Sequence, residues 1–124
     1  MGRTIAGIVA GIVGWVLVAT ILNFGLRALL PGYHAAEPTM VFTLAMKIAR
    51  LSIAALAALA SGALVRAIAP ASRFAPWIAG GIMLALFLPE HIRIWDKFPV
   101  WYHLTFLATL VPLVWFGARL VRRT

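Results

Sequence analysis

Hydrophobic residues run almost without interruption through four segments of the chain. These segments span residues 4–30, 39–69, 74–88 and 99–120, and short polar stretches separate them. Apolar positions do not alternate with polar ones inside the segments, so the pattern favours helices over strands. Inside a bilayer, only helices and closed barrels satisfy every backbone polar group. We therefore predict an all-α fold: an integral membrane bundle of four transmembrane helices with short loops.

Prolines stand at nearly every boundary between these segments. Proline disrupts the interior of a helix and is common just before or just after one. On this basis the first helix stops before Pro31 and the second begins at Thr39 and ends before Pro70. The third helix is predicted to end before Pro89, which leaves residues 89–98 as a loop that leads into the fourth helix.

The composition places this chain in lipid rather than in water. Hydrophobic residues make up 64% of the 124 residues and charged residues only 11%, with a mean hydropathy of +1.01. A soluble domain carries about a quarter of its residues as charges. The chain has the length of one domain, so we treat residues 1–124 as a single transmembrane domain. It contains no cysteine, which excludes disulfides and thiolate ligands.

The net charge of +8 does not indicate a nucleic-acid partner. The basic residues stand singly at the ends of apolar segments, where membrane proteins place them. They form no basic stripe with interleaved aromatic residues. The predicted partners are membrane lipids and either another membrane protein or further copies of this chain, and nucleic acid is excluded.

Charged residues fall at two levels along the predicted helices. Arg50 and Arg66 are sixteen residues apart, which is about 24 Å of helix, and the hydrocarbon core of a bilayer is about 30 Å thick. One level is entirely basic and contains Arg3, Arg66, Arg73, Arg119, Arg122 and Arg123. The other level contains Arg27, Lys47, Arg50, Arg93, Lys97, Glu37, Glu90, Asp96, His34, His91 and His103.

These two levels predict an orientation in the membrane. Cytoplasmic loops are enriched in Lys and Arg, so we place the all-basic level and both termini in the cytoplasm. The localisation that follows is a bacterial-type cytoplasmic (inner) membrane, crossed several times. Aromatic residues mark both levels and are interpreted as belts at the membrane surfaces: Trp77, Trp115, Tyr33, Trp95, Trp101 and Tyr102.

Small residues on two segments predict close helix packing. Gly7 and Gly11 form a G-x-x-x-G pair, and Ala54, Ala58 and Gly62 repeat that spacing on the second segment. Helices in lipid associate where small side chains let their backbones approach. The pattern suits a homodimer contact or packing within one bundle, and its recurrence on two helices favours the second.

A polar cluster at the mixed level supplies the candidate site residues. They are Asn23, Arg27, Lys47, Arg50, Glu90, His91, Asp96 and His103. The interpretation that the pattern favours is structural: the cations pair with Glu37, Glu90 and Asp96 and hold the outer ends of the helices together. Within it, we expect Glu90 or Asp96 to pair with Arg27, Lys47 or Arg50. The alternative is a site for a carboxylate, a phosphate or a lipid headgroup on Asn23, Arg27, Lys47 and Arg50. Polar groups within membrane segments usually face the bundle interior or a cavity, which suits that alternative.

The histidines offer a second kind of candidate site, for a metal ion. His34, His91 and His103 with nearby carboxylates offer ligands that suit zinc and similar ions. No closely spaced histidine motif is present, and nearby cations would oppose a bound metal ion. Only His103 lies clearly within a predicted helix, which disfavours haem. The metal and the cofactor, if any, are unknown.

The leading functional prediction is a non-enzymatic accessory or interaction subunit of a membrane complex. No catalytic residue is predicted, and the loops are too short for a soluble catalytic domain. The first alternative is a small oligomeric transporter or channel with an anion or ligand site at its outer face. The second is a metal- or cofactor-binding membrane protein.

Overall fold

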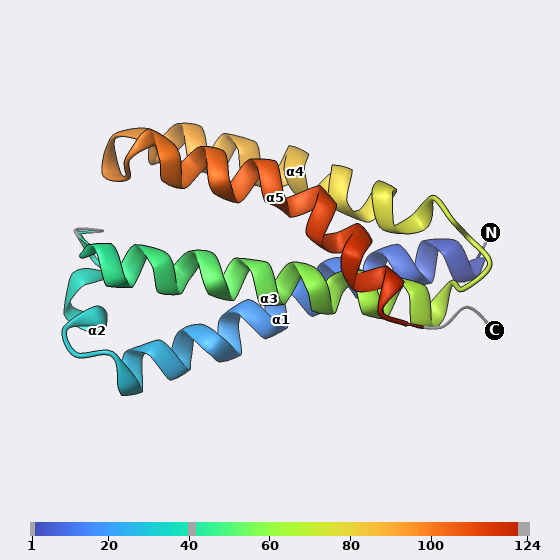
Figure 1. Ribbon diagram of the computed structural model, residues 1–124, viewed down its shortest axis with the longest axis horizontal. Coiled ribbons are helices and arrows are strands. Elements are labelled where there is room, and N and C mark those ends of the chain that lie inside the picture. Colours follow the sequence, from blue (N-terminus) through green and yellow to red (C-terminus); the bar gives the residue numbers. More distant parts are fainter. Residues whose placement is uncertain (1, 40–41, 122–124) are drawn as a thin grey trace.

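The computed structural model describes residues 2–39 and 42–121, and these residues are almost entirely helical (Figure 1). Within these ranges, four helices are long and apolar enough to cross a membrane, and no strand occurs. They are α1 (Gly2–Leu29), α3 (Leu44–Ile68), α4 (Ala75–Arg93) and α5 (Val100–Arg119). Two short helices, α2 (Tyr33–Ala36) and the 3-10 helix η1 (Trp95–Lys97), occupy the connections. The all-α prediction is confirmed.

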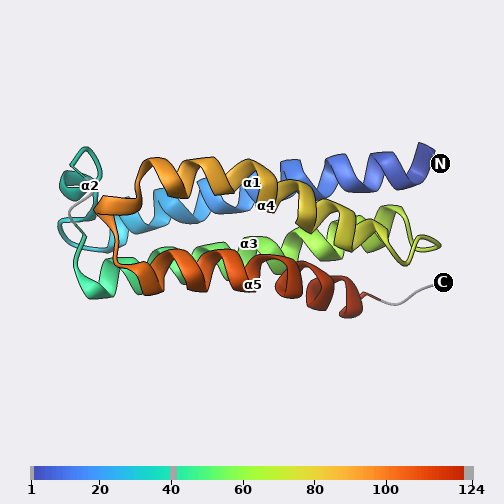
Figure 2. The same ribbon diagram turned by 90° about the horizontal axis from the view of Figure 1, so that it is seen from above.

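The long helices lie side by side and alternate in direction (Figures 1 and 2). Helix α3 is central and packs most extensively against α1 and α5, while α4 packs mainly against α5. We call the end that holds α2, η1, the end of α1 and the start of α3 the polar end. The start of α1 and the end of α5 lie at the opposite, basic end. Arg122 and Arg123 lie outside the described residues.

Helix α4 does not stop at Pro89, so the predicted end at residue 88 is wrong, and the predicted loop over 89–98 is reduced to a connection over residues 94–99. The helix continues to Arg93, and the Ile94 N–H still bonds to the Glu90 carbonyl at 3.1 Å. Pro89 is exposed, so its ring is accommodated without disturbing a packed neighbour. The extra turn places Glu90, His91 and Arg93 on a regular helix rather than in a loop.

Helix α3 begins five residues later than the predicted start at Thr39. Its N-cap is Thr43, whose hydroxyl accepts a hydrogen bond from the Met46 N–H at 3.2 Å. A threonine cap of this kind satisfies one of the free N–H groups in the first turn. The side chain of Met46 packs into a buried cluster at the polar end. Residues 40 and 41 lie outside the described ranges.

Glycines bring the backbones of the central helices together, as predicted for packing within one bundle. A Cβ on Gly7 would lie 3.0 Å from the Ala69 Cβ, and one on Gly11 would lie 3.1 Å from the Ser61 carbonyl oxygen. On the other side of α3, a Cβ on Gly62 would overlap the backbone carbonyl of Val114 in α5. The small residues of α1 and α3 therefore serve contacts inside this chain.

Candidate ligand-binding site at the polar end

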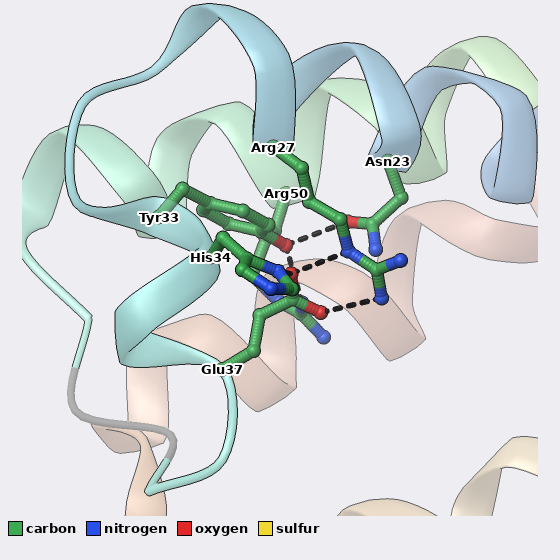
Figure 3. A network of polar contacts seen from close by, with 6 residues as sticks. All are labelled: Asn23, Arg27, Tyr33, His34, Glu37 and Arg50. Carbon is green, nitrogen blue, oxygen red and sulfur yellow. Dashed lines mark hydrogen bonds and ion pairs between the residues drawn. The ribbon is translucent and has the colours of Figure 1, made fainter.

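Arg50 is the centre of a hydrogen-bond network that joins four elements. It lies in the second turn of α3, where its Nη1 donates to the Tyr33 hydroxyl at 2.7 Å and its Nε donates to the Tyr102 hydroxyl at 3.1 Å. The Tyr33 hydroxyl in turn donates to the Asn23 side-chain oxygen at 2.6 Å (Figure 3). The network therefore connects α3 to α2, α5 and α1.

Aromatic rings surround the guanidinium of Arg50. Tyr33 stacks on Phe42, Phe42 on Phe98, and Phe98 on Tyr102, with ring centroids 5.4, 5.6 and 4.3 Å apart. The Arg50 Cζ atom lies 4.9 Å from the centre of the Phe42 ring and 5.8 Å from that of Phe98. These distances are in the range of cation–π attraction, so the rings stabilise the charge without neutralising it.

Two of these rings, those of Tyr33 and Tyr102, do not belong to the aromatic belt in which the sequence analysis placed them. Tyr33 and Tyr102 are only 0% and 4% exposed and belong to the core, whereas Trp95 and Trp101 are exposed. Burial raises the pKa of the Tyr33 hydroxyl, which counteracts the opposing effect of Arg50. The hydroxyl therefore stays protonated and continues to donate to Asn23.

Arg27, one of the predicted site residues, is occupied by Glu37. Its Nε and Nη2 donate to the two carboxylate oxygens of Glu37 at 2.6 and 2.9 Å (Figure 3). These hydrogen bonds hold the pKa of Glu37 below its ordinary value, so the carboxylate stays ionised. His34 Nδ1 lies 3.7 Å from the same carboxylate. Arg27 is therefore engaged with Glu37, a pairing that the structural interpretation included, rather than turned toward a ligand.

Glu90 pairs with its neighbour in α4, so the predicted pairing of Glu90 with Arg27, Lys47 or Arg50 is wrong. Its carboxylate lies 2.7 Å from Arg93 Nη2, one helical turn away. The continuation of α4 past Pro89 explains this pairing, because it puts Arg93 on the same face as Glu90.

Four other charged residues of the polar end have no ion-pair partner in residues 2–39 and 42–121. They are Asp96, Lys97, Lys47 and Arg50. Asp96 is exposed in η1, and Lys47 is partly buried in the first turn of α3. The predicted pairing of Asp96 with a cation of α1 or α3 is therefore also wrong.

His91 and His103 bond directly to each other. Their Nδ1 atoms are 2.7 Å apart, and His103 Nε2 lies 3.1 Å from the Trp95 carbonyl oxygen. A carbonyl can only accept, so His103 Nε2 carries a hydrogen; in a neutral His103, Nδ1 then accepts from the N–H of His91. Both rings are buried. The pair connects the end of α4 to η1 and the start of α5.

The histidines do not gather with the carboxylates of the polar end. His34 lies beside Glu37, whereas His91 and His103 pair with each other. Over the described ranges, no group of three or more His, Asp or Glu side chains is placed to hold a metal ion. His91 lies on a helix, contrary to the prediction that only His103 would.

An open cleft of about 250 Å³ lies between α1, α3 and α5, beside Arg50. Its polar lining consists of Trp15, Thr20, Asn23, Arg50 and Tyr102. Its apolar lining consists of Val16, Ala19, Ile53, Ala54 and Phe106. Of the eight predicted site residues, Asn23 and Arg50 line this cleft. The other six do not: Arg27, Lys47, Glu90, His91, Asp96 and His103.

Tyr102 lines the cleft but was not among the predicted site residues. No pattern in the sequence distinguishes it from a tyrosine at the membrane surface.

Comparison with known proteins finds no relative of this chain. No family model matches it, and neither a curated protein nor a solved structure is significantly similar to it.

Proposed function

We propose that this chain is a multi-pass membrane protein that binds an anionic ligand in the cleft beside Arg50. Four helices of sufficient length and apolarity within the described ranges support the membrane assignment. The proposed ligand site corresponds to one alternative from the sequence analysis, an anion site at the outer face of the bundle. The other interpretation was that the charged residues there only form ion pairs that hold the helix ends together.

The observation that carries the proposal is the unneutralised charge of Arg50 in the cleft wall. An arginine has five N–H donors and is always charged in proteins. Tyr102 and Tyr33 accept from two of these donors, and no carboxylate within the described ranges pairs with the others. A charge in this position is stabilised by a ligand of opposite sign.

The other polar groups of the cleft also favour a hydrogen-bond acceptor. The Asn23 oxygen is used by Tyr33, which leaves its amide hydrogens as donors. The Tyr102 oxygen accepts from Arg50, so its own hydrogen is available to donate. Carboxylates and phosphates, which are rich in acceptor oxygens, match this set of donors.

Arg50→Gln tests the proposal, with Arg27→Gln as the matched control. The probes are acetate, inorganic phosphate and decanoate, added to purified protein in an uncharged detergent. We expect at least one probe to raise the unfolding temperature of the wild type. Arg50→Gln should weaken binding of that probe at least tenfold, because a hydrogen bond to a charged group contributes about 1.5–3 kcal/mol.

Arg27→Gln should retain the ligand-dependent shift, since Glu37 already occupies that guanidinium. If Arg50→Gln does not fold, Arg50→Lys takes its place; it keeps the charge but loses the planar fork, and should weaken binding in the same direction. The absence of a shift with all three probes, or an equal shift in wild type and the Arg50 variant, would contradict the proposal.

The accessory-subunit function, the transporter or channel function and the metal- or cofactor-binding function stay predictions. An accessory subunit that carries a bound lipid-like ligand is compatible with the cleft. Mass spectrometry of the gently solubilised protein would report a partner chain, the copy number and a bound ligand in one measurement.

We also propose that the polar end faces the exterior of a bacterial-type inner membrane, with both termini in the cytoplasm. The basic end supports this, since Lys and Arg accumulate on the cytoplasmic side. Single cysteines at Ala36 and Asp96 should react with an impermeant thiol reagent in intact cells, whereas one at Ser72 should not. The reverse pattern of labelling would overturn the orientation.

A further inference from the structure

We infer that the ligand of the cleft is a single-chain amphiphile, with its anionic head on Arg50 and its chain along α1. This inference rests on the proposed anion-binding function and adds the class of ligand. It follows from how polar and apolar groups are distributed along the cleft, from its volume and from its surroundings.

The charge of the cleft is confined to one end. Along α1 the lining runs from Asn23, which is linked to Arg50 through Tyr33, back to Trp15. The two residues are eight positions apart, which corresponds to about 12 Å of helix. Between them the walls are mostly apolar: Val16 and Ala19 on α1 and Ala54 on α3 form them, and the hydroxyl of Thr20 is the one uncharged polar group that α1 adds there. A ligand that matches this lining carries its charge at one end and an apolar segment behind it.

The volume of the cleft suits one chain rather than two. At about 30 Å³ for each water-sized group, 250 Å³ holds roughly eight such groups. Sites for drug-sized ligands occupy about 300–1,000 Å³, so the cleft is small even for one complete ligand. It therefore accommodates the head and the first part of a single acyl chain.

The surroundings of the cleft supply such a ligand. Its apolar part lies within helices that are apolar enough to cross a membrane. Val16 in its wall and the neighbouring Leu17 are 51% and 56% exposed. In a bilayer these side chains face lipid, so a chain can enter the cleft sideways from the membrane. The head then stays at the polar end, where Arg50, Asn23 and Tyr102 present their donors.

The experiment uses decanoate with a photoreactive diazirine at the end of its chain, and the full-length protein in nanodiscs of phosphatidylcholine. Crosslinks are mapped by mass spectrometry of the digested protein. We expect them to concentrate around Trp15 on α1 and Ala54 on α3. Unlabelled decanoate should compete, while acetate and decyltrimethylammonium should compete at least tenfold less, because one lacks the chain and the other the negative charge.

Two substitutions on α1 separate the cleft from the general lipid-facing surface. Ala19→Leu fills the apolar wall of the cleft and should lower the crosslinking at least tenfold. Ala6→Leu makes the same change at an exposed position on the same helix that does not line the cleft, and should leave it unchanged. Nanodiscs that contain phosphatidylglycerol, an anionic lipid with two chains, distinguish the source of the ligand. If the site takes a single chain, this lipid does not compete and the decanoate crosslinks stay. If the site takes two-chain lipids, phosphatidylglycerol displaces decanoate and the crosslinks are lost.

Several results would overturn the inference. One is crosslinking spread evenly over the lipid-facing helices. A second is equal competition for the crosslinking by decanoate and decyltrimethylammonium. A third is an equal effect of Ala19→Leu and Ala6→Leu on the amount of crosslinking, and a fourth is loss of the crosslinks in nanodiscs that contain phosphatidylglycerol. If acetate or phosphate still raises the unfolding temperature through Arg50, the anion site stands and only the ligand class is wrong.

Discussion

Gly62→Leu is expected to break the contact between α3 and α5 and to unfold the protein at a much lower temperature. A Cβ at Gly62 would overlap the Val114 carbonyl and lie 2.8 Å from the Ala118 nitrogen. From the facing helix, a Cβ at Gly117 would overlap the backbone of Leu59. Backbone atoms cannot rotate away as a flexible side chain can, so the helices must separate. We expect a destabilisation of about 3 kcal/mol or more.

Gly81→Leu is the matched control for this prediction. It makes the same substitution in the middle of a long helix, α4, but a Cβ at Gly81 meets nothing within 4 Å. Leucine also has a higher helix propensity than glycine, so this variant should be as stable as the wild type. Thermal unfolding in detergent, followed by circular dichroism, measures both. Equal unfolding temperatures for the two variants would refute the close backbone contact.

His103→Leu is expected to release η1 from the bundle and to destabilise the polar end. The substitution leaves His91 Nδ1 and the Trp95 carbonyl oxygen without their partner. A buried polar group without a partner costs about 1–3 kcal/mol. The substitution also removes the stacking of His103 on Trp95, whose ring centroids are 4.4 Å apart. We therefore expect a loss of about 3 kcal/mol, with faster hydrogen exchange over residues 94–99.

His34→Leu provides the comparison for the histidine pair. Its side chain is 78% exposed, and its charge partner Glu37 keeps two hydrogen bonds from Arg27. Removing His34 should therefore leave both the unfolding temperature and the exchange rates close to those of the wild type. If the two histidine variants showed the same exchange over residues 94–99, the structural role assigned to His103 would be wrong.

The long helices could be predicted because membrane-spanning segments leave a strong signal in the sequence. Their ends could not all be predicted, because proline is compatible with two outcomes. Pro31 follows the end of α1, and Gly32 takes a left-handed conformation there, with φ 80°. Pro89 is carried inside α4. Which outcome occurs depends on what faces the proline ring, and that is a tertiary property.

The candidate site could be predicted in part. Asn23 and Arg50 stood out as polar residues inside apolar segments, and both line the cleft. Arg27 stood out for the same reason, but its partner Glu37 lies beyond a turn whose path the sequence does not define. Tyr102 has the depth of a membrane-surface residue and is instead buried. Depth follows from position along a helix, whereas the direction of a side chain follows from the packing of several helices.

The central position of α3 has a consequence for the order in which the chain can assemble during synthesis. The contact of α1 with α3 uses Gly7, Gly11 and Gly14 against residues no later than Ala69. These contacts can therefore form once Ala69 has left the ribosome. Helix α4 packs mainly on α5, the last helix to be made. Helices α1 and α3 can thus pair first, and α4 and α5 then complete the bundle together and cover the side chains of α1 that face them, such as Trp15.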